Sequence, residues 1–180
     1  AMETIIANLL DSEAINYGYK KLKLELFELS DMIGQTIQKS GFLSNSNITF
    51  IPLDYAAQVE ADKILFEVMI KNILENANRY NPVEGEPIQV WVEQVEDTYK
   101  IKIRDFGPGF SKEDLTKVTE PFYRTGQSRS RQSGGFGLGL YLCKQIVEAH
   151  QGTIAIANHE ETGAVVALTI PKRQNLMENS

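Results

Sequence analysis

The stretch from Asp62 to Tyr80 reads DKILFEVMIKNILENANRY, and the spacing of its apolar residues predicts an amphipathic α-helix. Successive helical residues lie about 100° apart around the axis, so Glu67, Lys71 and Glu75 share one charged, solvated face. The opposite side carries an apolar stripe made of Leu65, Phe66, Val68, Met69, Ile70, Ile73 and Ala77. A stripe of this width indicates that the helix packs against a hydrophobic core.

Two asparagines, Asn72 and Asn76, lie inside this apolar stripe, one helical turn apart. A buried amide costs free energy unless its hydrogen bonds are made. One alternative is that nearby backbone groups satisfy both amides. Two amides at the end of one stripe favour instead a cavity that holds a ligand. An asparagine oxygen suits Mg²⁺, which keeps water and phosphate oxygens among its ligands.

A further polar residue stands at the end of the predicted strand Thr98–Asp105. Alternation places Asp105 on the buried face with Ile101 and Ile103, directly before Phe106-Gly107-Pro108-Gly109. A recessed carboxylate can accept a hydrogen bond from an exocyclic amine such as that of adenine, and glycines let the backbone approach a flat ring. An aspartate that merely closes a Gly/Pro turn is the alternative.

Glycines 134, 135, 137 and 139 lead into a second helical pattern, Leu140–Ala149, for which Gly152 is the expected left-handed C-terminal cap. A glycine-rich helix start offers free N–H groups and partial positive charge to phosphate. The cluster is not a Walker A loop, because no Gly-Lys-Ser/Thr follows. It is not the dinucleotide fingerprint either, because Leu140 takes the place of the third glycine. A flexible linker is the alternative, but a linker would not lead into so regular a helix.

Together these segments resemble the ATP-binding catalytic domain of bacterial sensor histidine kinases, within the GHKL (Bergerat-fold) ATPase superfamily. The resemblance covers about residues 21–172 and rests on four blocks in the family's order. They are Asn72-Ile73-Leu74-Glu75-Asn76-Ala77 (N box), Asp105-Phe106-Gly107-Pro108-Gly109 (G1 box), Glu120-Pro121-Phe122-Tyr123-Arg124 (F box) and Gly135-Phe136-Gly137-Leu138-Gly139-Leu140 (G2 box). The expected fold class is α+β, a two-layer α/β sandwich in which helices cover one face of a mixed, mostly antiparallel sheet.

The resemblance implies roles for individual residues around bound ATP and Mg²⁺. Asn76 would hold Mg²⁺, the catalytic Asn72 would line the phosphate site, and Asp105 would bind the adenine amine. Residues 110–134 would form a lid over the nucleotide, with Arg124 and Arg131 steadying the phosphates. The implied ATP-binding residues are Asn72, Asn76, Arg79, Tyr80, Asp105, Gly107, Gly109, Phe110, Phe122, Tyr123, Arg124, Arg131, Gly135, Gly137, Leu138, Gly139 and Leu140.

Asn72 also separates the branches of this superfamily. Hydrolytic members carry a glutamate at this place that activates water, whereas an amide cannot usefully accept a proton. Asn72 therefore favours phosphoryl transfer to a protein side chain, which the resemblance implies is a histidine; such transfer depends mainly on positioning and charge neutralisation. The alternatives are a hydrolytic ATPase of the same superfamily and a degenerate interaction module, whose nucleotide boxes would be broken.

A phosphoacceptor histidine in a His-Glu-x-x-x-Pro setting is missing, because His150 ends a predicted helix and His159 lies in a turn. We expect the acceptor on a separate dimerisation domain of a homodimeric parent kinase, with a response regulator downstream. Residues 1–18 resemble the tail of the dimerisation hairpin, an ordinary first helix being the alternative, and residues 173–180 form a polar tail. One departure from the family is Ala164, where such kinases often carry Ser or Thr.

Composition bounds the function further. The 180 residues are 42% apolar with a net charge of −6, which fits one globular domain and speaks against general nucleic-acid binding. No apolar run spans a bilayer and no signal peptide is recognisable, so we expect a cytoplasmic domain without membrane contact. The single Cys143 excludes an internal disulfide.

The rest of the chain predicts a series of strands and one more helix. That helix runs to Lys39 from a cap at Ser30 or Asp31. The pattern of the first predicted strand, residues 21–29, does not distinguish clearly between strand and helix periodicity. The predicted strands lie at residues 21–29, 48–51, 55–59, 88–95, 153–157 and 164–170.

Overall fold

The structure is a computed structural model, and it describes residues 21–40, 48–125 and 139–174. Residues 1–18, which the sequence assigns to a dimerisation hairpin, lie outside these ranges, as do residues 175–180 of the polar tail. Within the described ranges the chain forms a five-stranded sheet, a two-stranded ribbon and four helices.

The five-stranded sheet is mixed and mostly antiparallel, as the sequence predicts. Its strand order is β2-β4-β5-β7-β6. Strand β2 runs parallel to β4, and the other neighbouring pairs are antiparallel. The strands are β2 (Ile48–Ile51), β4 (Ile88–Val95), β5 (Thr98–Arg104), β6 (Thr153–Asn158) and β7 (Ala164–Pro171).

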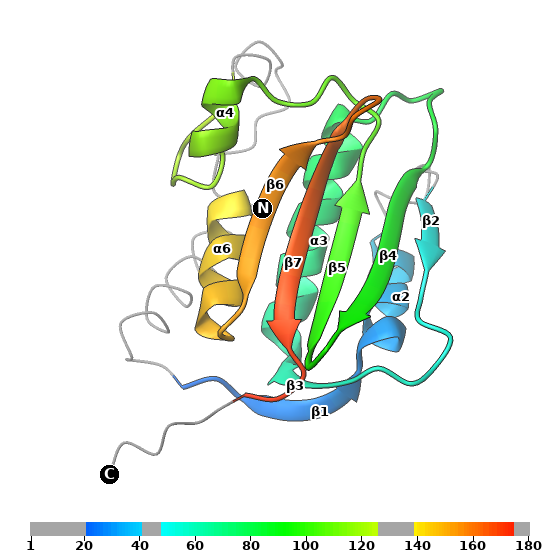
Figure 1. Cartoon of the computed structure of the whole chain (residues 1–180), viewed down its shortest axis with the longest axis vertical. Coiled ribbons are helices and arrows are strands. Elements are labelled where there is room, and N and C mark those ends of the chain that lie inside the picture. Colours follow the sequence, from blue (N-terminus) through cyan, green and yellow to red (C-terminus); the bar gives the residue numbers. More distant parts are fainter. Residues whose placement is uncertain (1–20, 41–47, 126–138, 175–180) are drawn as a thin grey trace.

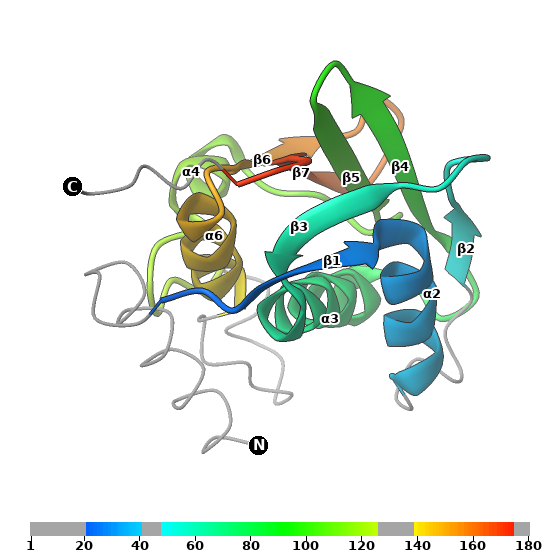
Figure 2. The same cartoon turned by 90° about the horizontal axis from the view of Figure 1, so that it is seen from below.

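Three helices cover one face of this sheet (Figure 1; Figure 2). They are α2 (Leu29–Lys39), α3 (Lys63–Tyr80) and α6 (Gly139–Ala149). This is the predicted two-layer α+β sandwich, and it places the asparagine-bearing helix α3 beneath the sheet. No helix in the described part of the chain combines the length and the apolar character that a bilayer crossing needs.

Strands β1 (Leu24–Glu28) and β3 (Gln58–Asp62) form a separate antiparallel ribbon that the sequence does not predict. Leu24 pairs with Asp62, and Glu28 pairs with Gln58. The predicted strand 55–59 is therefore wrong in its bounds, because pairing with the distant β1 decides which residues are bonded. Strand β3 runs directly into α3, whose N-cap is Asp62.

The start of α2 also corrects a prediction. Neither Ser30 nor Asp31 caps this helix; the N-cap is Glu28. Its carboxylate accepts the backbone N–H of Asp31 at 2.6 Å and that of Ala57 at 2.7 Å. The glutamate therefore caps α2 and holds the segment before β3 at the same time, a tertiary contact that local sequence cannot reveal.

The expected left-handed cap at Gly152 is wrong as well. The residue with positive φ after α6 is Gln151, at 61°. A Cβ at position 152 would lie only 2.3 Å from the carbonyl oxygen of Thr169 on β7. Glycine is needed there because the chain passes close to β7.

A short helix that the sequence analysis does not predict, α4 (Lys112–Lys117), lies inside the segment assigned to the lid. Its cap is Ser111, whose Oγ accepts the Asp114 N–H at 3.0 Å and donates to Asp114 Oδ2 at 2.8 Å. The sequence signal for this helix is the Ser-x-x-Asp spacing of a capping box.

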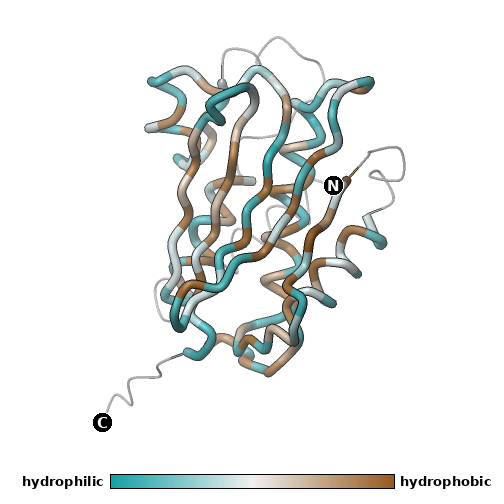
Figure 3. Tube along the Cα trace, turned by 45° about the vertical axis from the view of Figure 1, so that its right-hand side comes forward, coloured by the Kyte–Doolittle hydropathy of each residue, from teal (hydrophilic) through white to brown (hydrophobic). Residues whose placement is uncertain are grey.

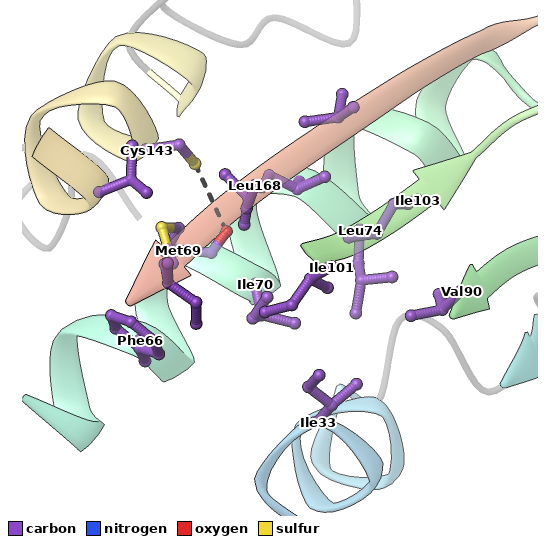
Figure 4. Packing of buried hydrophobic residues seen from close by; sticks show 14 of the residues in the cluster. Ile33, Phe66, Met69, Ile70, Leu74, Val90, Ile101, Ile103, Cys143 and Leu168 are labelled. Atoms are coloured by element: carbon purple, nitrogen blue, oxygen red, sulfur yellow. Dashed lines mark hydrogen bonds between the residues drawn. The ribbon is translucent and has the colours of Figure 1, made fainter. Parts of the chain in front are cut away.

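The apolar stripe of α3 packs into the core as predicted (Figure 4). Phe66 and Met69 are fully buried beside α6, where the Cys143 thiol donates to the Met69 carbonyl oxygen at 3.4 Å. Ile101 and Ile103 of β5 close the core from the sheet side. Hydrophobic and hydrophilic residues alternate along the strands (Figure 3), because one face of the sheet meets the helices and the other does not.

Candidate functional site

Several segments that carry predicted site residues meet at one end of the sheet. Helix α3 and strand β5 end there, beside the turn between β6 and β7, and α4 lies at the same end of the molecule, above α6 (Figure 1). The loop Asp105–Phe110, called the G1 loop below, follows β5 directly. Its neighbours on either side are the C-terminal end of α3 and the β6–β7 turn.

Asp105 is recessed at the start of the G1 loop, with an exposed fraction of 6%. Its Oδ1 accepts the backbone N–H of Gly107 at 2.9 Å and that of Ala164 at 3.3 Å. No described residue donates to Oδ2, so this oxygen keeps its acceptor capacity. Burial raises the pKa of the Asp105 carboxyl, and the two backbone N–H groups and the charge of Arg104 oppose that rise. A hydrogen-bond donor on a ligand would stabilise the ionised form.

Gly107 brings the G1 loop against the end of α3. A Cβ at this position would lie 2.5 Å from the carbonyl oxygen of Tyr80. Asn81, the C-cap of α3, reinforces the contact, since its Oδ1 accepts the Phe106 N–H at 2.8 Å and its Nδ2 donates to Glu86 O at 3.0 Å. The sequence predicts glycine here for the approach of a flat ring. In the structure it permits two protein segments to pack closely.

The β6–β7 turn closes on the other side of the G1 loop. Gly163 has φ of 87°, and a Cβ there would lie 1.8 Å from the carbonyl oxygen of Asp105. Thr162 Oγ1 donates to Gly107 O at 3.1 Å. The turn therefore fixes both the start and the middle of the loop.

Arg104, the last residue of β5, makes a third set of contacts between the G1 loop and the β6–β7 turn. Its guanidinium lies 4.2 Å from the centre of the Phe106 ring. The same group pairs with Glu161 Oε2 at 3.2 Å and donates to Thr162 O at 3.3 Å. The side chain is buried despite its charge, and its Nε makes no hydrogen bond.

The two asparagines of α3 are half-buried and differ in their partners. Asn72 Nδ2 donates to Val68 O at 2.9 Å. For this donor, the alternative that nearby backbone satisfies the amide is therefore correct. Its Oδ1 lies 3.7 Å from the place that a Cβ on Gly139 would take, which brings the start of α6 to Asn72. Asn76 has no side-chain hydrogen-bond partner within residues 21–40, 48–125 and 139–174.

Two aromatic residues from the predicted set form a corner at the same end of the sheet. The rings of Tyr80 and Phe110 meet edge to face, with centroids 6.3 Å apart and planes at 65°. Arg79, beside Tyr80, is half-buried and engaged with another group. The structure thus brings Asn72 of the predicted N box to Gly139, at the end of the predicted G2 box, and packs the G1 loop against the C-terminal end of the same helix.

Residues 61–174, most of the chain that forms this end of the sheet, match the family described as "Histidine kinase-, DNA gyrase B-, and HSP90-like ATPase". The chain belongs to this ATPase family. The matched segment is therefore an ATP-binding domain, and ATP is the nucleotide that the family membership supports.

Curated relatives of this ATPase domain include sensor kinases of bacteria. The chain is 31% identical over 169 residues to Sensor protein KdpD of Clostridium acetobutylicum, covering 93% of this chain and 19% of that protein. It is 34% identical over 159 residues to the signal transduction histidine-protein kinase BaeS of Escherichia coli, covering 88% of this chain and 34% of the relative. The chain thus spans about a third or less of the length of these two relatives.

Solved structures share the fold of this ATPase domain. The mycobacterial sensor histidine kinase MprB superposes with a TM-score of 0.73 at 24% identity, over 84% of this chain and all of that chain. The Acinetobacter baumannii histidine kinase AdeS superposes with a TM-score of 0.72 at 22% identity, over 93% of this chain and 76% of the other. At these identities the likeness speaks for the fold alone.

The residues of the predicted F box lie after α4. Phe122 is 68% exposed and has φ of 63°, a conformation that is rare for an aromatic residue. The Tyr123 hydroxyl donates to Asp114 Oδ1 at 2.7 Å, and this bond raises the pKa of the phenol. Arg124 is half-buried and has a partner. Tyr123 is therefore tied to α4 through the atom that could otherwise reach a ligand.

Much of the predicted G2 box lies outside the described residues. This holds for Gly135, Gly137 and Leu138, and also for Arg131. Leu140 is described, and its side chain is buried in the core, so only its backbone could contact a nucleotide.

Sequence reasoning missed three residues that shape the site. Asn81, Asn158 and Thr162 each hold the G1 loop by a side-chain hydrogen bond. A weak signal exists for Asn81, because asparagine before proline is typical of an element's end. Asn158 and Thr162 carry no local signal, since their partners are about fifty residues away in the chain.

Proposed function

We propose that this chain binds Mg²⁺ and ATP and serves as the catalytic part of a sensor histidine kinase. In this proposal it donates the γ-phosphoryl group to a histidine on a separate dimerisation domain. The observation that carries the proposal is the recessed Asp105, whose Oδ1 is occupied by two backbone N–H groups while Oδ2 keeps its acceptor capacity. Family membership makes ATP the ligand that this acceptor serves.

The adenine end of the nucleotide is assigned to the G1 loop. Asp105 Oδ2 would accept a hydrogen bond from the exocyclic amine, which guanine does not offer at that position. The Tyr80–Phe110 corner lies at the same loop and supplies apolar surface for a flat ring. Burial favours this arrangement, because a charge-assisted hydrogen bond is stronger where water is excluded.

The phosphate end is assigned to the asparagines, Arg79, Arg124 and the start of α6. Asn76 fits Mg²⁺ because its half-buried amide has no protein partner in the described part of the chain. The same part contains no group of three His, Cys, Asp or Glu residues that could hold a metal ion. A magnesium ion bound here would take most of its ligands from phosphate and water, as Mg²⁺ usually does. When bound, it would neutralise charge on the phosphate oxygens.

Transfer rather than hydrolysis follows from Asn72. Its amide donates to Val68 O and offers no basic group to activate water. In the transfer step a histidine ring nitrogen attacks the γ-phosphorus. The new nitrogen–phosphorus bond forms as the bond to the β–γ bridging oxygen breaks, and ADP leaves.

The acceptor histidine belongs to another domain in this proposal. His150 is fully buried, and the His159 ring accepts the Glu161 N–H at 3.2 Å within its own turn. The parent would be a cytoplasm-facing homodimer with a response regulator as its downstream partner. The names of the sensor-kinase relatives support a role of the parent in signal transduction by a histidine kinase.

Nucleotide titration tests the binding half of the proposal. Asn76→Ala should weaken binding of ATP in the presence of Mg²⁺ and have little effect in its absence. Ile64→Ala, on the exposed side of the same helix, is the matched control and should bind as the wild type does. Equal affinity of wild type and Asn76→Ala at saturating Mg²⁺ would remove the metal assignment.

A phosphorylation assay tests the transfer half. The chain is mixed with a dimeric helical hairpin that carries a phosphoacceptor histidine, or is studied within its parent protein, with γ-labelled ATP. Acid-labile label should appear on the hairpin and not on this chain. Sustained phosphate release by the chain alone would favour the hydrolytic alternative, and absence of nucleotide binding would favour the degenerate module.

A further inference from the structure

We propose that Asn158 is a positioning residue for nucleotide binding, acting through the backbone of Phe110. The inference rests on the proposed function, since Phe110 is one of the residues assigned to the nucleotide. Asn158 ends β6 and is about fifty positions away from Phe110, and neither the boxes of the family nor the sequence pattern points to it.

The first observation is a two-point contact between one side chain and one residue's backbone. Asn158 Oδ1 accepts the Phe110 N–H at 2.8 Å, and Asn158 Nδ2 donates to Phe110 O at 2.7 Å. The amide therefore imitates a strand neighbour and fixes the peptide groups on both sides of the Phe110 Cα. Two hydrogen bonds restrict rotation that a single bond would leave open.

The second observation is the register of the β6–β7 hairpin. Asn158 pairs with Ala164 across the two strands. Ala164 in turn is bonded to Asp105 twice: its N–H donates to Asp105 Oδ1 at 3.3 Å, and its carbonyl oxygen accepts the Asp105 N–H at 3.0 Å. One cross-strand pair thus holds both ends of the G1 loop, with Ala164 on Asp105 and Asn158 on Phe110.

The third observation concerns Gly109, which lies between these two ends. A Cβ at this position would lie 2.7 Å from Asn158 Oδ1, and the residue has φ of 73°. The second glycine of the G1 box therefore makes room for the Asn158 amide. The loop and the amide fit each other, which a coincidental surface contact would not require.

The consequence for binding comes through the Phe110 ring. That ring meets Tyr80 edge to face, so the position of the Phe110 backbone decides where the aromatic corner stands relative to Asp105. Asn158 keeps the distance between the carboxylate and the corner constant before the nucleotide arrives. Preorganisation of this kind lowers the entropy that binding must otherwise remove.

Titration of Asn158→Ala and Asn158→Leu with ATP and Mg²⁺ tests the inference, with Glu160→Gln as the control. Leucine keeps much of the side-chain volume and removes both hydrogen bonds. Glu160 is exposed in the same turn. Because the Asn158 bonds are solvent-exposed, we expect the dissociation constant to rise about fivefold in both variants and not in the control. The midpoint of thermal unfolding should change little.

Two further readouts separate positioning from general stability. Hydrogen exchange of the Phe110 N–H should become faster in both Asn158 variants, while that of buried strand residues stays unchanged. In a Phe110→Ala background the substitution Asn158→Ala should no longer weaken binding, because the ring that it positions is gone. Additive losses in the double variant would overturn the inference.

The outcomes also separate this inference from the function on which it rests. A wild-type chain that does not bind ATP overturns both. A wild-type chain that binds ATP, with Asn158 variants of equal affinity, overturns only the role of Asn158. Should one variant fail to fold, the other and the hydrogen exchange of Phe110 decide the question.

Discussion

The ring of His150 accepts the backbone N–H of Asp62 at 3.0 Å through Nε2. Its Nδ1 lies 2.8 Å from the carbonyl oxygen of Ile146, which can only accept a hydrogen bond. The neutral tautomer with the proton on Nδ1 therefore satisfies both contacts. The end of α6 is thereby bonded to the N-cap of α3, the helix that carries Asn72 and Asn76.

The buried His150 predicts a loss of stability in mild acid. Burial lowers the pKa of His150 below its ordinary value of 6.5, although the Ile146 carbonyl and the Asp62 charge oppose this. Below pH 6.5 the unfolded chain takes up a proton that the folded chain resists. The free energy of unfolding should therefore fall as the pH drops from 6.5 towards the lowered pKa. Urea unfolding at a series of pH values measures this.

The variant His150→Ala separates this effect from other titrations. It should destabilise the fold by about 2–4 kcal/mol, because it leaves the Asp62 N–H without a partner and opens space beside Phe66. Its unfolding free energy should also depend less on pH between about 5 and 7.

Asp105 predicts opposite effects on stability and on binding. Asp105→Asn removes a charge whose burial is unfavourable, while the amide oxygen can still accept from Gly107. Its unfolding free energy at neutral pH should equal or exceed that of the wild type. Its affinity for ATP should drop about tenfold or more, because a charged acceptor is lost. Unfolding and titration of the same preparation measure both, and parallel losses would contradict the assignment.

The pH dependence of binding offers a separate test of Asp105. Because the pKa of Asp105 is raised, its carboxylate becomes protonated, and loses its charge as a hydrogen-bond acceptor, at a higher pH than an ordinary aspartate, whose pKa is 3.8. The ratio of the dissociation constants of Asp105→Asn and wild type should therefore shrink as the pH falls through that raised pKa. Titration of the phosphates affects both proteins alike and cancels in the ratio.

Two glycines with different surroundings predict opposite effects of alanine. Gly163→Ala would push a Cβ against the Asp105 carbonyl oxygen at a positive φ and should destabilise the fold by more than about 2 kcal/mol. Gly34→Ala, inside α2, places its Cβ 3.8 Å from Phe50 Cε1, an ordinary contact. It should stabilise the fold by about 0.5–1 kcal/mol, because alanine is the better helix former. Thermal unfolding of both variants measures the contrast.

Cys143 is expected to be unreactive in the folded state. Burial raises the pKa of its thiol far above the ordinary value, and the thiol donates to the Met69 carbonyl oxygen. A thiol reagent at pH 8 should label Cys143 of the native chain no faster than the protein unfolds locally around it, and should label the chain rapidly in denaturant. Rapid labelling without denaturant would show that the contact between α3 and α6 is loose.

Much of the fold can be predicted from local patterns. Helix α3, the β4–β5 hairpin and helix α6 begin and end within a residue or so of their predicted bounds. These elements bury one regular face each, and a regular face leaves a periodic trace in the sequence. The β1–β3 ribbon and the hydrogen bond from the Ala57 N–H to Glu28 lack such a trace, because the residues that they join lie about thirty to forty positions apart.

The candidate site divides in the same way. The sequence identifies three candidate site residues, because a polar side chain on an apolar face violates the local pattern. They are Asn72, Asn76 and Asp105. Asn81, Thr162 and Asn158 violate no pattern, since polar residues are ordinary in turns and at strand ends. Their importance arises from the backbone groups that the folded chain brings to them.

The amino-acid sequence alone determines which faces are buried, where the predicted nucleotide boxes lie and that an amide, Asn72, stands where the resemblance places a glutamate in hydrolytic members of the superfamily. These properties depend on side-chain chemistry and on spacing within one element. Only the tertiary structure decides that Gly107, Gly109 and Gly163 are needed for close approach of protein segments, and that one strand pair holds both ends of the G1 loop. The physical reason is that hydrogen bonds and steric contacts between distant segments depend on distances that exist only after the chain has folded.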